Sequence, residues 1–78
     1  DATHVFDDPH RLMRLDRIEN GEERWQTIGE SYGSTLLLVA HTVWDDEAGI
    51  EIIRIISARL ATRNERKQYH EYRAKDFG

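Results

Sequence analysis

The most constraining feature of this sequence is the shortness of the connections between its apolar runs. Asn20-Gly21 is the strongest of these turn signals, because both residue types tolerate positive φ. Residues 31–34 form a second turn, and the acidic segment 45–49 forms a third. Since parallel strands need long crossovers, three short connections in a row predict an antiparallel meander of four strands.

The four predicted strands differ in their apolar patterns. Residues 11–16 have a poor period and predict an edge strand, whereas residues 23–30 alternate between two faces. Residues 35–44 are apolar on both faces and therefore predict a strand inside the sheet. Residues 50–58 are also apolar on both faces and rich in β-branched side chains, which predicts a second strand of this kind.

Helical signals flank the strands. Thr62 and Glu65 form a capping box for a helix that runs to about Arg73. Apolar spacing in residues 1–6 is typical of the last turn of a helix, with a frayed arm as the alternative. The sequence predicts an α+β fold in one domain, residues 1–78, with one face of the sheet open to a partner or to function.

Composition narrows the function classes. The chain has no cysteine, which excludes disulfides and thiolate metal sites and makes a cytoplasmic setting the expectation. The longest apolar run, residues 36–40, is too short to cross a bilayer. The four histidines lack metal-ligand spacing, and no phosphate loop or zinc-protease motif is present. We therefore expect neither a metal nor a cofactor.

The net charge of −4 is unevenly distributed. Residues 1–50 carry 4 Arg and 11 Asp or Glu, a net charge of −7, whereas residues 51–78 carry 7 Lys or Arg and 4 Asp or Glu, a net charge of +3. A globally acidic chain argues against nucleic-acid binding, but the basic segment supplies a local field that favours it. The acidic part would equally suit a basic protein partner.

Arg54 lies within a predicted strand among four isoleucines, where an arginine without a partner is rare. It either pairs with a carboxylate or reaches solvent, or it holds a phosphate on the open sheet face. Alternation places Arg54 and Arg59 on opposite faces. His41, in the neighbouring strand, either packs in the core or faces Arg54 and moves a proton in phosphoryl chemistry.

The predicted C-terminal helix carries four basic residues at helical spacing, Arg63, Arg66, Lys67 and His70. This stripe is either a solvated face or a contact for an RNA backbone. Tyr69 lies on the opposite side, where we expect it to pack on the sheet while its hydroxyl reaches the edge of a site.

Together these residues resemble a known family. Segments 5–9, 22–29, 37–42 and 54–69 are similar to BrnT toxins, most specifically in the run Arg-Ile-Ile-Ser-Ala-Arg-x-Ala-Thr-x-x-Glu-x-x-x-Tyr that ends at Tyr69. The resemblance covers nearly the whole chain. It implies a RelE-like fold and a metal-independent ribonuclease toxin of a type II toxin–antitoxin system that inhibits translation. A BrnA-type antitoxin would be its partner.

Carried onto this sequence, the resemblance implies four catalytic residues: His41, Arg54, Arg59 and Tyr69. Arg54 and Arg59 would hold phosphate, and His41 or Tyr69 would move the proton when the ribose 2′-hydroxyl attacks its own phosphate. Arg63, with the rest of the basic stripe, would steer the RNA backbone. Family members usually begin earlier, with a further strand and helix, so the chain is expected to be N-terminally short.

Three hypotheses follow from these patterns. The first is an RNA-cleaving toxin neutralised by its antitoxin. The second is a non-catalytic module of the same fold that binds only the antitoxin or itself, and the third is a small domain in which Arg54 forms a salt bridge and no site exists. Assembly as a homodimer or as a toxin–antitoxin hetero-tetramer is left open, and no membrane contact is expected.

Overall fold

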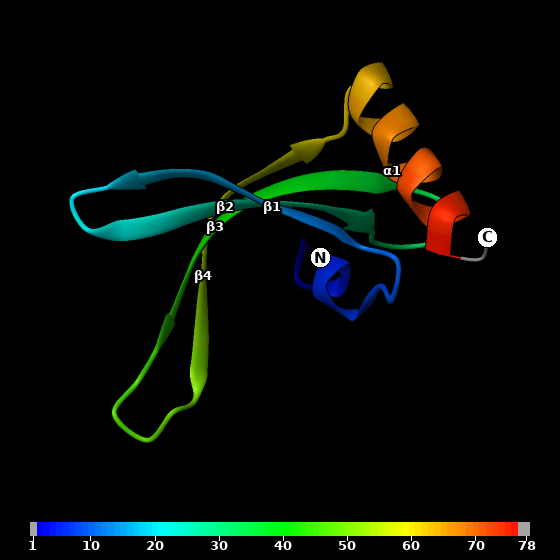
Figure 1. The fold of residues 1–78 in the computed structure, drawn as a ribbon. Helices are drawn as coiled ribbons and strands as arrows, with labels where there is room; N and C mark the ends of the chain where they lie inside the picture. Colours follow the sequence, from blue (N-terminus) through cyan, green and yellow to red (C-terminus); the bar gives the residue numbers. More distant parts are fainter. Residues whose placement is uncertain (1, 77–78) are drawn as a thin grey trace.

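Four strands pair in chain order into one antiparallel sheet, with a helix on each face at the same end (Figure 1). The structure is a computed structural model that describes residues 2–76. The elements are the 3-10 helix η1 (Ala2–Asp7), the strands β1 (Leu12–Glu19), β2 (Glu22–Glu30), β3 (Leu36–Asp45) and β4 (Glu51–Leu60), and the helix α1 (Arg63–Asp76). The predicted α+β fold, a meander followed by a C-terminal helix, is confirmed.

The first hairpin turns at Asn20-Gly21, as predicted. The φ angle is 54° at Asn20 and 79° at Gly21, so both central residues are left-handed, as in a type I′ turn. Pairing reaches the turn itself, with Glu19 opposite Glu22. β1 lies at the sheet edge, which confirms the prediction, but it continues past residue 16 to Glu19.

β4 forms the other edge of the sheet. The apolar pattern of residues 50–58 predicts a strand inside the sheet, like residues 35–44, and this position is wrong. No strand within residues 2–76 pairs with the outer edge of β4. Ile53, Ile56 and Leu60 are consequently 37%, 43% and 68% exposed. β3 lies between β2 and β4 and is the most buried strand, as its sequence predicts.

η1 packs on one face of the sheet over β2 and β3. Val5 is fully buried, and the ring of Phe6 meets the ring of His41 edge-on, with centroids 4.9 Å apart. Gly29 permits this approach, because a Cβ at that position would lie only 2.9 Å from Cγ1 of Val5. The helical turn predicted near the N-terminus is therefore present as a 3-10 helix, except that residue 1 lies outside the described residues.

α1 covers the opposite face. Its predicted capping box is confirmed: the backbone N–H of Thr62 donates to Oε1 of Glu65 at 2.8 Å, and the backbone N–H of Glu65 donates to Oγ1 of Thr62 at 3.2 Å. The core beneath the helix consists of Ile28, Leu36, Leu38 and Tyr69. The cap fixes where α1 begins, and the core fixes which side of α1 faces the sheet.

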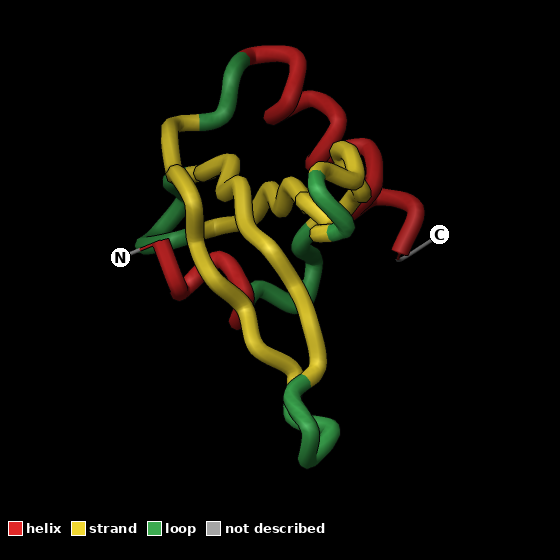
Figure 2. The backbone as a smooth tube through the Cα atoms, turned by 90° about the vertical axis from the view of Figure 1, so that its left-hand side faces the viewer, coloured by secondary structure: helices red, strands yellow, loops and turns green. Residues whose placement is uncertain are grey.

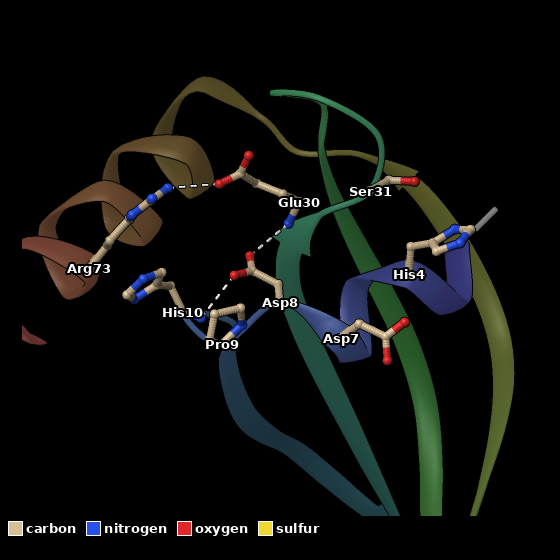
Figure 3. A pocket seen from close by; sticks show the side chains of 8 residues that line it. All are labelled: His4, Asp7, Asp8, Pro9, His10, Glu30, Ser31 and Arg73. Atoms are coloured by element: carbon tan, nitrogen blue, oxygen red, sulfur yellow. Dashed lines mark hydrogen bonds and ion pairs between the residues drawn. The ribbon is translucent and has the colours of Figure 1, made fainter.

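Asp8 joins η1, β2 and α1 at one end of the sheet, beside an open pocket (Figure 3). Its Oδ2 accepts hydrogen bonds from the Tyr69 hydroxyl at 2.5 Å and from the backbone N–H of Glu30 at 2.9 Å. Its Oδ1 accepts one from the backbone N–H of His10 at 2.8 Å. Burial alone would raise the pKa of Asp8, but these hydrogen bonds outweigh it and lower the pKa. Arg73 adds an ion pair to Glu30 at 2.7 Å.

The two hairpins diverge towards their tips. Pairing between β2 and β3 ends at Arg24 opposite Thr42, whereas pairing within each hairpin continues beyond this point. Figure 2 shows the β3–β4 hairpin projecting from the body of the molecule, with its loop at the far end. The sheet is therefore continuous beneath α1 and η1 and is split at the opposite end.

We expect Tyr69→Phe to lower the free energy of unfolding by about 2 kcal/mol, because it removes a buried hydrogen bond to a charged carboxylate. Tyr72→Phe is the matched control, since Tyr72 is exposed on the same helix and its hydroxyl has no hydrogen bond among the described residues. Urea unfolding followed by circular dichroism measures both. Equal stability of the two variants would contradict the role assigned to Asp8.

Candidate functional site

Five arginines lie on the sheet face that α1 covers: Arg14, Arg17, Arg24, Arg54 and Arg59. Residues directly opposite one another on neighbouring strands share a face. Arg24 and Arg54 are both opposite Thr42, and Arg17 is opposite Arg24. Arg59 is opposite Leu38, which belongs to the core beneath α1. Nη1 of Arg14 donates a hydrogen bond to Oε1 of Gln68 on α1 at 3.0 Å. We call these five side chains the arginine face.

A β-bulge in β4 brings Arg54 and Arg59 onto the same face. Ala40 is opposite Ser57, but the next residue of β3, His41, is opposite Ile55, so Ile56 is an extra residue. The prediction that Arg54 and Arg59 lie on opposite faces is therefore wrong. The extra residue reverses the alternation between them, which a strict period of two cannot anticipate.

A second bulge has the same effect in β1. Leu15 is opposite Trp25 and Arg17 is opposite Arg24, so Asp16 is the extra residue. Arg14 and Arg17 are three residues apart and would point to opposite faces in a regular strand. With the bulge, both belong to the arginine face.

Two glutamates connect three of these arginines into a row across the sheet. Glu19 Oε2 lies 3.1 Å from Nε of Arg17 and 3.6 Å from Nε of Arg24. Glu22 Oε1 lies 3.9 Å from Nη2 of Arg24 and 3.4 Å from Nη2 of Arg54. The contacts of Arg24 and Arg54 are long, and Nε of Arg24 is buried without a hydrogen bond. The row therefore holds more cationic donor capacity than its carboxylates use.

Arg59 is held differently, by a bidentate ion pair with Glu65 at the start of α1. The two N–O distances are 2.7 Å and 2.9 Å. The hydrogen bonds from Arg59, reinforced by the backbone of Thr62, lower the pKa of Glu65 to about 2. The same contact raises the pKa of Arg59. Arg59 is still about half exposed, with its side chain at 51%.

His41 lies on the other face, under η1, and does not meet Arg54. It is opposite Trp25 and Ile55, whereas Arg54 is opposite Thr42. The imidazole is fully buried, and its Nε2 forms a hydrogen bond with Oγ1 of Thr27 at 2.7 Å. Burial lowers the pKa of His41, so the ring is neutral at pH 7. Within the described residues, His41 therefore packs in the core, which is the first of the two alternatives that the sequence left open.

Tyr69 is also fully buried, between α1 and the sheet. Burial and the hydrogen bond to Asp8 raise its pKa, so the hydroxyl keeps its proton. By contrast, all four residues of the predicted basic stripe of α1 are exposed: Arg63, Arg66, Lys67 and His70. The structure thus brings Arg54 and Arg59 to one face, leaves the stripe accessible to solvent, and separates both predicted proton carriers from this surface.

Sequence reasoning missed three arginines and two glutamates: Arg14, Arg17, Arg24, Glu19 and Glu22. Arg24 had a usable signal, because it shares a predicted face with Gln26 and Ile28 in regular alternation. Arg17 had none, since its face depends on a bulge that no Gly or Pro marks. The two glutamates enter the site only because the turn places them opposite each other.

The described part of the chain shows no cluster of three or more His, Asp or Glu side chains arranged to hold a metal ion. Within the same residues, no helix is long and apolar enough to span a membrane. The five arginines give the arginine face guanidinium groups, which bind phosphate through paired N–H donors.

A comparison with protein families identifies a matching family. The model of a family described as a ribonuclease toxin, BrnT, of type II toxin–antitoxin systems matches residues 1–65. This range contains all four strands and the whole arginine face, and it ends near the start of α1. The comparison with curated proteins gives no match.

We expect Glu65→Gln to be most destabilising near pH 7. A carboxyl whose pKa is lowered on folding stabilises the protein above its ordinary pKa of 4.5, and this contribution is lost as the pH falls towards about 2. The difference in unfolding free energy between wild type and Glu65→Gln should shrink accordingly in urea titrations from pH 7 to pH 2.5. Glu71→Gln, at an exposed position of the same helix, serves as the control. A difference independent of pH would contradict the ion pair.

Proposed function

The chain belongs to the family of BrnT ribonuclease toxins of type II toxin–antitoxin systems, and from this premise we propose that it cleaves RNA without a metal ion. The ribose 2′-oxygen forms a bond to the adjacent phosphorus while the bond to the 5′-oxygen breaks. One group accepts the 2′-hydroxyl proton and another protonates the departing oxygen. Cleavage inhibits translation, and a BrnA-type antitoxin neutralises the toxin.

The observation that carries this proposal is the arginine face. The phosphorane formed during in-line attack bears more negative charge than the RNA phosphate, so fixed cationic donors stabilise it preferentially. Arg54 is 60% exposed, and its one ion pair among the described residues is the 3.4 Å contact to Glu22. Arg54 and Arg59 therefore hold the phosphate in our proposal, with Arg24 between the two hairpins as a third donor.

The glutamates of the row do not block this role. Exposed ion pairs contribute about 0–1 kcal/mol each, because water screens the charges and long side chains lose freedom. A phosphate offers more acceptor oxygens in a geometry that matches guanidinium. RNA can therefore displace Glu22 from Arg54 at little cost in free energy.

The roles of His41 and Tyr69 in proton transfer stay predictions. His41 is neutral at pH 7, as a general base must be, but its ring is buried under η1. Tyr69 retains its proton, and its hydroxyl donates a hydrogen bond to Asp8. Either residue could act only after exposure of its side chain, so the proposal assigns phosphate binding to the arginines and leaves proton transfer to be tested by His41→Ala and Tyr69→Phe.

The basic stripe of α1 extends the surface for RNA. Arg63, Arg66, Lys67 and His70 are exposed, and α1 borders the arginine face through the contact between Arg14 and Gln68. We assign these four residues to backbone contacts rather than to chemistry. Their contribution should depend strongly on salt, because such contacts release counterions.

A non-catalytic module is the second candidate. Burial of both predicted proton carriers favours it, because neither the imidazole of His41 nor the phenol of Tyr69 is accessible at the arginine face. Such a module would bind the antitoxin or a second copy of itself and leave RNA intact. A cleavage assay separates the two candidates.

We expect purified protein to cleave total RNA in the presence of EDTA, and Arg54→Ala to reduce the rate by about 100-fold, as for loss of a donor to a developing oxyanion. Arg54→Lys should restore part of the rate, since lysine keeps the charge without the bidentate geometry. Lys75→Ala, at an exposed position near the end of α1, is the control for loss of one positive charge.

Two results would overturn the cleavage proposal. Folded wild-type protein that leaves RNA intact, with and without the ribosome, would favour the non-catalytic module. Folded Arg54→Ala that cleaves at the wild-type rate would place the reaction elsewhere on the chain. Circular dichroism of each variant establishes that it is folded.

We also expect Glu22→Gln to bind RNA about 5-fold more tightly at low salt, because it removes the carboxylate that competes for Arg54. Glu23→Gln changes the net charge equally, but Glu23 is opposite Ile18 on the other sheet face and serves as the matched control. Fluorescence anisotropy with a labelled RNA at two salt concentrations measures both. Equal gains in the two variants would indicate a general charge effect and contradict the competition.

A further inference from the structure

The diverging hairpins enclose a cleft that the proposed cleavage does not use. Its lining residues come from the tips of both hairpins, beyond the last β2–β3 pair. Figure 1 shows the two tips diverging. The volume of the cleft is about 670 Å³, which falls within the usual range of ligand pockets. A cleft of this size admits a few side chains of a partner.

Carboxylates line the cleft from both hairpins: Glu22, Glu23, Asp45 and Glu51. Glu22 pairs with arginines, but the other three form no ion pair among the described residues. Asp45 lies directly opposite Glu51, and Glu19 lies directly opposite Glu22. Like charges in direct opposition destabilise a sheet, and both hairpins carry such a pair near the tip. Arginines already contact Glu19 and Glu22, so a cationic group bound in the cleft would relieve the repulsion between Asp45 and Glu51.

The same cleft exposes apolar side chains. Ile18 is 63% exposed, Trp44 is 43% exposed, and the half-buried Val43 also lines the cleft. Large apolar side chains surrounded by polar residues are typical of protein–protein contact sites. Apolar contact surface would add nothing to the binding of a simple cation, and the carboxylates would repel the phosphates of RNA.

We propose that this cleft binds a basic segment of a partner protein, in which Lys or Arg residues flank one large apolar side chain. The apolar side chain packs between Ile18 and Trp44, and the cationic groups face Glu23, Asp45 and Glu51. The charge of the cleft and its apolar lining both select this occupant. The inference goes beyond RNA cleavage, because binding in the cleft requires no chemistry on the arginine face.

The test uses the full chain and a short synthetic peptide in which lysines flank a central phenylalanine. Isothermal titration calorimetry should detect binding, and the double variant Glu23→Gln/Asp45→Asn should weaken it by about 10-fold, which corresponds to about 1.4 kcal/mol. Replacing the phenylalanine of the peptide by serine should weaken it to a similar extent. Both protein substitutions keep the size of the side chain, and circular dichroism checks the fold.

A second double variant, Asp7→Asn/Glu71→Gln, removes the same charge outside the cleft and should bind the peptide like wild type. Absence of binding to wild type would overturn the proposal. Equal weakening in the two double variants would show a non-specific charge effect and would also overturn it. An RNA oligonucleotide that competes with the peptide for wild type, but not for Glu23→Gln/Asp45→Asn, would assign the cleft to nucleic acid instead.

Discussion

The alternation of side chains along a strand is the constraint on which the functional surface depends. A regular sheet would divide Arg14 from Arg17 and Arg54 from Arg59 between its two faces. One extra residue in β1 and one in β4 reverse the alternation, so that all five arginines share a face. The other face carries η1 and the buried His41 at one end, with Ile18 and Glu23 near a hairpin tip. Two bulges thus gather arginines from three strands on the α1 side of the sheet, beside the core of Ile28, Leu36 and Leu38.

Local signals in the sequence predict most of the fold. The Asn20-Gly21 turn, the short connections and the capping box at Thr62 each depend on neighbouring residues, and each is confirmed. The edge position of β4 and the junction at Asp8 depend on distant parts of the chain. Asp8 and Tyr69 are 61 residues apart, and no periodicity indicates that they meet. Helices, strands and turns can therefore be predicted from the sequence more reliably than the contacts between them.

The sequence indicates that arginines form the candidate site, but it does not show that they share one face of the sheet. Sequence reasoning selects Arg54 because a charged residue within an apolar strand requires a partner, and it selects Arg59 through the family resemblance. It selects His41 and Tyr69 by their chemistry alone. Whether such a group can act depends on its exposure, which follows from the face that η1 or α1 covers. The family match supports ribonuclease activity, but the burial of these two residues means that the acid and base of the reaction require their own experiments.

The uneven charge of the sequence takes a specific form in space. Acidic residues of the first half gather at the hairpin tips, whereas arginines from both halves meet on one sheet face. Glu22 belongs to both regions, because it lines the cleft and pairs with Arg54 at 3.4 Å. A cationic group in the cleft that also reaches Glu22 would compete with Arg54 for this carboxylate. Under our two proposals, partner binding and phosphate binding are coupled through this one side chain, although they use opposite charges and different parts of the sheet.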